Sequence, residues 1–232
     1  MRRAPDLTIY LRAIPLLARQ PSVFVGPLLG AVAALALAAL ATYVTAPLGG
    51  AGASLFDFAA RVFYSFAFGV AIVHADALER GLRATFDSAW EEARRKGGGI
   101  IVAAIGFWFL VMIAEYVGAL FGLTGQIVLM LVAAFFLIYT IPAAAIGGLP
   151  GSLALGGSFR AVRADLLGAA ILAVAFVGLF VVLPPYLVNV IGERVLLSHT
   201  EQVLLQALFE AIALGYLAFP FAKQYANLAF RA

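Results

Sequence analysis

Four charged residues lie within otherwise apolar stretches of this 232-residue sequence, where they could form ion pairs or bind a charged ligand: Asp57, Arg61, Glu115 and Glu210. Asp57 and Arg61 are four residues apart, which places them on one face of a helix. Charged side chains inside long apolar segments usually mark a ligand pathway or a buried ion pair. The sequence leaves two interpretations open. Either a polar cavity lets Arg61 hold an anionic head group, or Arg61 forms a structural ion pair with one of the carboxylates.

Patterns for other kinds of chemistry are weak or missing. The chain has no cysteine, which excludes disulfides, thiol catalysis and cysteine-ligated metals. The G-x-S-x-G, Walker A and dinucleotide-binding glycine patterns do not occur. His74 could ligate a metal or a pigment, but a histidine without a second ligand nearby more often makes a structural hydrogen bond. We therefore expect no catalytic residue, no metal and no cofactor, and a protein that is not an enzyme.

Membrane-spanning helices must position these charged residues. The chain is 64% hydrophobic and 12% charged, whereas about 25% of residues are charged in a typical soluble domain. Its apolar stretches match the ~20 residues that a helix needs to cross a bilayer. We predict an all-α, polytopic transmembrane bundle that forms one membrane domain over residues 1–232. The six predicted spans are Ser22–Thr45, Leu55–Ala77, Gly98–Leu120, Gly125–Gly147, Asp165–Ile191 and Val203–Phe230.

The positions of the basic residues predict the orientation of the chain. If the N-terminus is cytoplasmic, 13 of the 15 Lys and Arg residues fall on the cytoplasmic side, and only Arg61 and Arg194 fall on the other. An excess of this kind marks cytoplasmic loops. Both termini are therefore expected in the cytoplasm. The net charge of +3 does not indicate nucleic-acid binding, because the basic residues flank apolar spans.

Two cytoplasmic connectors have the apolar spacing of short amphipathic helices. Leu82–Lys96 places Phe86 and Trp90 on one face, and Leu155–Leu166 repeats the pattern more weakly with Phe159. Such helices lie in the membrane interface with their aromatic side chains among the acyl chains. We predict that both lie on the inner leaflet, with Phe86, Trp90 and Phe159 as interfacial anchors.

Basic residues at the cytoplasmic ends of the spans could form a collar around lipid head groups. The positive-inside rule alone also accounts for most of them. The predicted collar comprises Arg94, Arg95, Lys96, Arg160, Arg163 and Lys223.

Small residues recur at every fourth position of the first span. Gly26, Gly30, Ala34 and Ala38 would let a second helix approach closely, as small residues do in membranes. The partner could be another span of this chain or a different subunit.

Proline occurs inside spans four, five and six, where it either kinks a helix or helps to line a cavity. These residues are Pro142, Pro184, Pro185 and Pro220.

The two connectors also suggest an internal repeat of about 69 residues. A shift of that length places Trp90 on Phe159 and Arg94 on Arg163. Residues 55–122 and 124–192 would then each contain a span, an interfacial helix and a second span, like the parallel repeats of some transporters. The alternative is two similar hairpins that face the same interface.

One segment resembles a known family. The resemblance rests on a proline, a small-residue stretch, a Ser–aromatic pair and an Arg before the next span. These residues are Pro142, Ser152, Ser158-Phe159, Val162-Arg163, Asp165-Leu166 and Gly168. The pattern is similar to that of bacterial six-helix membrane proteins grouped with the membrane domain of glycerophosphoryl diester phosphodiesterases. This chain departs from it after the proline, where relatives often carry an acidic residue and this sequence reads Ala143-Ala144-Ala145. The resemblance implies a membrane architecture in a bacterial inner membrane more than it implies a reaction.

The function expected from these observations is the binding or movement of a lipid or another amphiphile, without catalysis. The alternative is an accessory or scaffold subunit of a larger membrane complex. Expected partners are membrane lipids, with other membrane subunits or a second copy of the chain as further possibilities.

Overall fold

The computed structural model describes residues 6–44 and 49–229. For residues 44, 49–53 and 229 it describes the backbone only. Arg2, Arg3 and Arg231, which contribute to the predicted orientation, lie outside the described residues, as do the predicted span ends Thr45 and Phe230. Every regular element in the described part of the chain is a helix, and six of these helices are long and apolar enough to cross a membrane. The predicted all-helical chain of six apolar spans is thereby confirmed.

The first hairpin joins α2 (Val25–Val44), which follows the short η1 (Pro21–Phe24), to α3 (Gly49–Glu79). Glycines of α2 let the two backbones approach. A Cβ atom added at Gly30 would lie 2.6 Å from the Cβ of Ala67, and one at Gly26 would lie 3.0 Å from the Ala67 carbonyl oxygen. Gly26 and Gly30 therefore pack against a span of the same chain, whereas Ala34 and Ala38 line the cavity described below.

The second hairpin joins α5 (Gly97–Ala119) to α6 (Gly122–Phe136), and the fourth span continues as α7 (Thr140–Ala145). Gly122 adopts a φ of 77° in the tight turn, a conformation that glycine tolerates without a steric cost. The fourth span was predicted as one stretch, but the helix breaks at residues 137–139, before Pro142. The broken turn is possible because a side chain from another helix satisfies the freed backbone groups, as described below.

The third hairpin contains the fifth span, built from α9 (Leu166–Phe176), the π-helical η2 (Val177–Val182) and α10 (Leu183–Val195). The second arm of this hairpin is the sixth span, α11 (His199–Ala229). Asp165 begins α9 by accepting a hydrogen bond from the Gly168 amide at 3.0 Å. Pro184 and Pro185 have no amide hydrogen to donate to the preceding turn. This loss of two backbone donors is a local cause for the wide π turn of η2 directly before them.

Three short helices do not span: α1 (Thr8–Arg19), α4 (Phe86–Arg95) and α8 (Ser152–Ala164). The segments of α4 and α8 were expected to be helical. Thr85 Oγ1 caps α4 by accepting a hydrogen bond from the Ser88 amide, and Ser88 Oγ accepts one from the Thr85 amide. The helix α1 was not predicted, although its spacing of Ile9, Ala13 and Leu17 is helical and all three side chains are buried.

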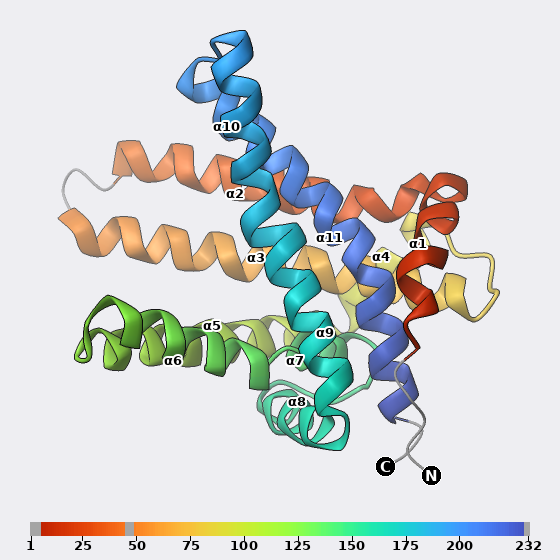
Figure 1. Ribbon diagram of the computed structural model, residues 1–232. Coiled ribbons are helices and arrows are strands. Elements are labelled where there is room, and N and C mark those ends of the chain that lie inside the picture. The colour runs from red at the N-terminus through yellow and green to blue at the C-terminus, as the bar shows by residue number, and fades with distance from the viewer. Residues whose placement is uncertain (1–5, 45–48, 230–232) are drawn as a thin grey trace.

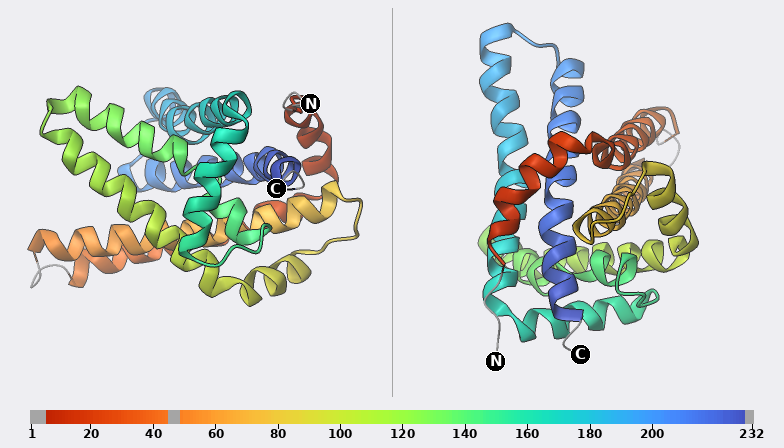
Figure 2. Two further views of the ribbon diagram at one scale, coloured as in Figure 1. Left: turned by 90° about the horizontal axis from the view of Figure 1, so that it is seen from below. Right: turned by 90° about the vertical axis from the view of Figure 1, so that its right-hand side faces the viewer.

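The three hairpins diverge from one densely packed end of the molecule. Figures 1 and 2 show α1, α4, α7 and α8 on the side of this base, while the α10–α11 turn and the tip of the α5–α6 hairpin point in different directions, to the top and to the left of Figure 1. Buried residues cluster toward the base, for example Ile72, Ile100, Tyr139 and Phe219. By contrast, α6 has no buried residue. Side chains between the diverging hairpins are therefore not packed against a full set of neighbours.

Candidate functional site

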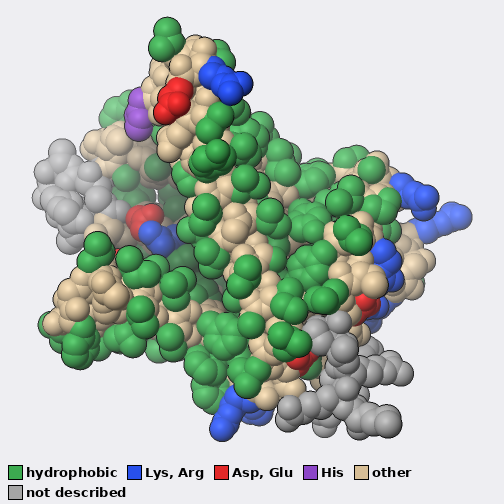
Figure 3. Space-filling view, viewed as in Figure 1, with side chains coloured by type: hydrophobic (Ala, Val, Ile, Leu, Met, Phe, Trp, Pro, Cys, Tyr) green, Lys and Arg blue, Asp and Glu red, His purple; other side chains and the backbone are tan. Residues whose placement is uncertain are grey.

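A cavity of about 1260 Å³ lies between the diverging hairpins. Residues of α2, α3, α5, α6, α9, η2 and α11 line it, so five of the six spans and part of the broken fourth contribute. Figure 3 shows a hollow in the surface between the α10–α11 hairpin and the α5–α6 hairpin, where an acidic and a basic side chain gather among apolar ones. The sequence predicted polar groups in this part of the chain but not the size of the cavity.

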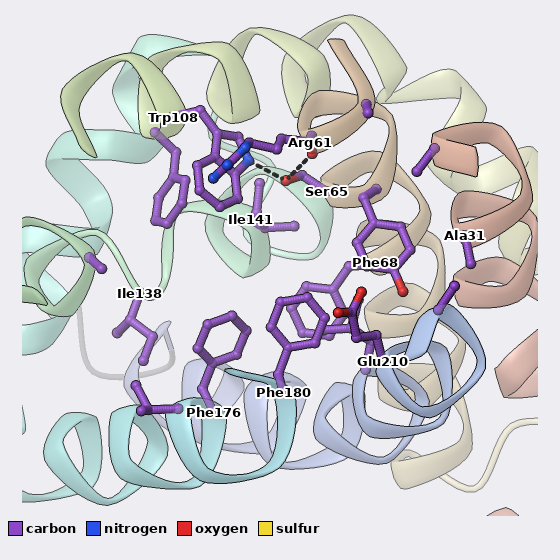
Figure 4. A pocket seen from close by; sticks show the side chains of 18 of the residues that line it. Ala31, Arg61, Ser65, Phe68, Trp108, Ile138, Ile141, Phe176, Phe180 and Glu210 are labelled. Atoms are coloured by element: carbon purple, nitrogen blue, oxygen red, sulfur yellow. Dashed lines mark hydrogen bonds between the residues drawn. The ribbon is translucent and has the colours of Figure 1, made fainter. Parts of the chain in front are cut away.

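One wall of the cavity carries Arg61 and its partners (Figure 4). The Arg61 Nε atom donates to Asp57 Oδ2 at 2.8 Å, and the guanidinium lies 4.9 Å from the ring centre of Trp108. The Trp108 indole N–H donates to Ser65 Oγ at 2.9 Å, and Ser65 Oγ donates to the Arg61 carbonyl oxygen. The positive charge of Arg61 thus already has a carboxylate and an aromatic face beside it.

The opposite wall carries Glu210 on α11 (Figure 4). Gln206, one turn earlier, donates an amide N–H to Glu210 Oε1 at 2.8 Å. Within the described residues, no Lys or Arg side chain forms an ion pair with Glu210. Tyr64 also lines the cavity, and its hydroxyl oxygen is buried without a hydrogen-bond partner in the described part of the chain. Near Glu210 the cavity therefore holds polar atoms that residues 6–44 and 49–229 leave incompletely paired.

Aromatic rings cover much of the remaining wall. The ring centres of Tyr64 and Phe180 are 6.0 Å apart, those of Phe180 and Phe176 5.1 Å, and those of Phe176 and Phe221 6.0 Å. Phe68 continues this row, 5.1 Å from Phe221. Phe176 directly precedes the π turn of η2 and Phe180 lies within it, so this widened turn of the fifth span forms part of the cavity wall.

The structure brings together three of the four charged residues predicted to cluster. Asp57, Arg61 and Glu210 line the cavity, whereas Glu115 does not. Glu115 Oε1 accepts a hydrogen bond from the Gln126 side chain at 2.9 Å, across the α5–α6 hairpin. Of the three carboxylates considered for Arg61, Asp57 on the same helix is the partner. Arg61 therefore pairs within α3, with one of the carboxylates that the sequence had left open.

The predicted basic collar is largely engaged with the protein. Arg94 and Arg95 pair with Glu91 and Glu92, and Lys223 Nζ lies 3.6 Å from Glu79 Oε2. Lys96 pairs with Glu92 at 2.8 Å and donates to the Ala145 carbonyl oxygen at 3.0 Å. Lys96 therefore supplies a donor for the open C-terminal end of α7.

Arg160 and Arg163 complete the collar on α8. Among the described residues, neither forms an ion pair with a carboxylate. Arg163 lies over the Phe159 ring at 5.4 Å. Arg160 and Arg163 are therefore the members of the predicted collar for which the described residues supply no carboxylate.

The predicted anchors pack partly against the protein. Trp90 meets Phe66 of α3 edge to face at 5.7 Å and lies 6.0 Å from Phe86. Phe159 packs on Phe136 at 5.0 Å and remains 42% exposed. Each short helix thus sets an aromatic residue against the span before it. This parallel agrees with the order of elements expected for a repeat, which remains a prediction.

A chain of polar contacts at the base was missed at the sequence level. Tyr139 donates its hydroxyl to Gln224 Oε1 at 3.1 Å, and Gln224 Nε2 donates to the Tyr10 hydroxyl oxygen at 3.0 Å. Tyr216 donates to the Tyr10 carbonyl oxygen at 2.7 Å, which ties α1 to α11. Burial raises the pKa of Tyr10 to about 12. The only sequence signal was a polar run near the end of the sixth span that includes Tyr216 and Gln224.

His74 does not lie in the cavity. It is buried in α3, and its Nε2 atom lies 3.4 Å from the Ala84 carbonyl oxygen. In residues 6–44 and 49–229, no cluster of three or more His, Asp or Glu side chains could hold a metal ion. The site is therefore an aromatic cavity with one internal ion pair and one carboxylate without a cationic partner. Comparison with protein-family models, with curated proteins and with solved structures finds no match to this chain.

Proposed function

We propose that this protein binds or moves a lipid or another amphiphile in the cavity between its diverging hairpins, and that it is not an enzyme. The observation that supports this is the size and character of the cavity: about 1260 Å³, mainly apolar, with a few polar groups. Pockets for drug-sized ligands occupy ~300–1,000 Å³ and have the same mixture of apolar lining and few polar groups.

The length of the cavity also suits an amphiphile. Its lining residues on α11 extend from Val203 to Phe221, which corresponds to about 27 Å of helix at 1.5 Å per residue. Asp57 and Arg61 lie toward the divergent end, Glu210 lies near the middle of the lined part of α11, and the apolar Ile141 and Phe221 lie toward the base. A polar head group would therefore sit at the divergent end with its apolar part directed to the base.

The proposal includes the orientation of the chain in a bacterial inner membrane. With both termini in the cytoplasm, the base lies at the inner leaflet and the cavity opens toward the outer side. Reporter fusions after Gly122 and Ser198 should report the outer side, and fusions after Lys96 and Arg163 the cytoplasmic side. A cytoplasmic signal from the Gly122 fusion would contradict this orientation.

Mass spectrometry of the purified protein tests the binding of amphiphiles directly. Ala173→Phe and Ala207→Phe each place a ring in the cavity, whereas Ala36→Phe adds the same ring at an exposed site of α2 that does not line the cavity. Lipids or other amphiphiles should be retained by the wild type and by Ala36→Phe and be reduced several-fold in the two cavity variants. Equal retention by all four proteins would contradict the proposal.

One observation favours the alternative of a scaffold subunit. The helix α6 has no buried residue, so a broad apolar face of the second hairpin is available to a partner in the membrane. A stable complex with another membrane protein that survives purification, and that a charged substitution at the exposed Val128 or Val132 disrupts, would support this alternative.

A further inference from the structure

We propose that the amphiphile that fits this cavity is a cation: a hydrophobic molecule with a positively charged centre, held by Glu210 and by the aromatic rings around it. The inference rests on the proposed function and specifies its ligand class. It also reverses the expectation, open at the sequence level, that Arg61 would hold an anionic head group.

The charge of the cavity wall is the first support. Arg61 is paired with Asp57 at 2.8 Å, so these two side chains contribute no net charge. Glu210 accepts a hydrogen bond from the neutral Gln206 and pairs with no cation among the described residues. With Glu210 ionised, the charged side chains that line the cavity, Asp57, Arg61 and Glu210, sum to −1. A charged group in a membrane interior normally has a partner, and a bound cation would supply the one that Glu210 lacks.

The aromatic lining is the second, independent support. Cations are attracted to the faces of aromatic rings, most strongly where water is excluded. The row Tyr64, Phe180, Phe176 and Phe221 has successive ring centres 5.1–6.0 Å apart and borders the same cavity as Glu210. On the opposite wall the protein already uses this contact, because the Arg61 guanidinium lies 4.9 Å from the Trp108 ring centre.

The Tyr64 hydroxyl is the third support. Its oxygen is buried and has no hydrogen-bond partner in the described part of the chain. A buried hydroxyl without a partner is costly, and such groups call for an explanation such as a missing ligand. An ammonium N–H of a bound amine could donate to this oxygen while its charge faces Glu210.

Two probes of the same shape and opposite charge test the inference. Tetraphenylphosphonium is a hydrophobic cation and tetraphenylborate is its anionic counterpart. Binding of each to the full chain in detergent micelles is measured by equilibrium dialysis, with protein-free micelles subtracted. We expect saturable binding of tetraphenylphosphonium and much weaker binding of tetraphenylborate. Glu210→Gln should lower the affinity for the cation about tenfold, because it removes the partly buried countercharge.

Glu115→Gln is the matched control. Glu115 is another half-buried carboxylate that accepts a hydrogen bond from a glutamine, but it does not line the cavity. Its substitution should leave the affinity for tetraphenylphosphonium within about twofold of wild type. Phe180→Leu, which removes an aromatic face and leaves every charge in place, should weaken cation binding several-fold. This second variant tests the proposal should Glu210→Gln fail to fold.

The outcomes separate this inference from the proposed function. Equal or tighter binding of tetraphenylborate, or an unchanged affinity for the cation in Glu210→Gln, would overturn the cationic ligand class. If neither probe binds but the wild type retains an amphiphile that Ala207→Phe loses, the inference fails and the proposed function stands. If neither probe binds and no amphiphile is retained, both fail.

Discussion

The hydroxyl oxygen of Ser158 on α8 lies 2.9 Å from the backbone nitrogen of Tyr139, which belongs to the break in the fourth span, and accepts a hydrogen bond from it. Ser158 also donates to the Phe136 carbonyl oxygen at 2.9 Å. One buried side chain on α8 therefore satisfies both a donor and an acceptor that the interrupted helix leaves free. The break is part of the fold because its backbone groups keep their partners.

Ser158→Ala is expected to destabilise the protein by about 1–3 kcal/mol, because it leaves a buried amide without a partner. Thermal unfolding in detergent would measure the loss. Ser152→Ala on the same helix is the control, since Ser152 is exposed and should change stability little. Equal melting temperatures for the two variants would show that the Ser158 bonds do not hold the break.

Lys96 is expected to make the base sensitive to acid. Its hydrogen bond lowers the pKa of Glu92 below the ordinary value of 4.5. A carboxyl whose pKa is lower in the folded state stabilises the fold above its unfolded pKa, and this stabilisation is lost as the pH falls through the folded pKa. Wild-type stability should therefore decline below about pH 4.5, and Lys96→Met should remove part of that decline.

The control for Lys96 is Arg95, which pairs with the same Glu92 but is 73% exposed. Arg95→Met should cost about 0–1 kcal/mol at neutral pH. Lys96→Met should cost more, because the Ala145 carbonyl loses its donor as well. Unfolding measured at neutral pH and at pH 3.5 would compare the variants, and identical pH profiles for wild type and Lys96→Met would contradict the prediction.

The Asp57–Arg61 pair predicts non-additive effects of substitution. Asp57→Asn or Arg61→Gln alone leaves one charge without a partner in the membrane region, whereas the double variant leaves none. Each single variant should thus be less stable than the double variant by about 1 kcal/mol or more. Unfolding of the wild type and the three variants in lipid nanodiscs gives the coupling free energy. A coupling near zero would show that the pair is solvated.

Gly30→Ala should destabilise the contact between α2 and α3. The added Cβ atom would lie 2.6 Å from the Cβ of Ala67, so one helix must shift. Overpacking of this kind costs about 1–3 kcal/mol. Ala36→Val adds bulk at an exposed site of the same helix and should be nearly neutral. If Gly30→Ala instead changed only the oligomeric state seen by light scattering, these glycines would belong to a contact between subunits.

Much of the fold was predictable because its signals are local. Apolar stretches of membrane length predicted the six spans, since the cost of placing polar groups in hydrocarbon acts on each segment separately. The spacing around Phe86 and Phe159 predicted the two short helices α4 and α8. The pairing of Arg61 with Asp57 follows from a separation of four residues on one helix. The helix α1 had the same periodicity but lies in a short, mixed segment where the signal is weak.

The tertiary structure alone decided which faces meet. In a membrane the hydrophobic effect does not drive helices together, because the lipid tails are as apolar as the side chains. The positions at which helices cross therefore depend on close packing at points such as Gly30 and Ala67. The divergence of the hairpins, which no local pattern encodes, opens the cavity and brings Glu210 among aromatic rings from other spans. The same crossings place Glu115 beside Gln126 and bring Lys96 to Ala145. The sequence therefore determined which residues enter the membrane, and the packing of the helices determined which of them share a site.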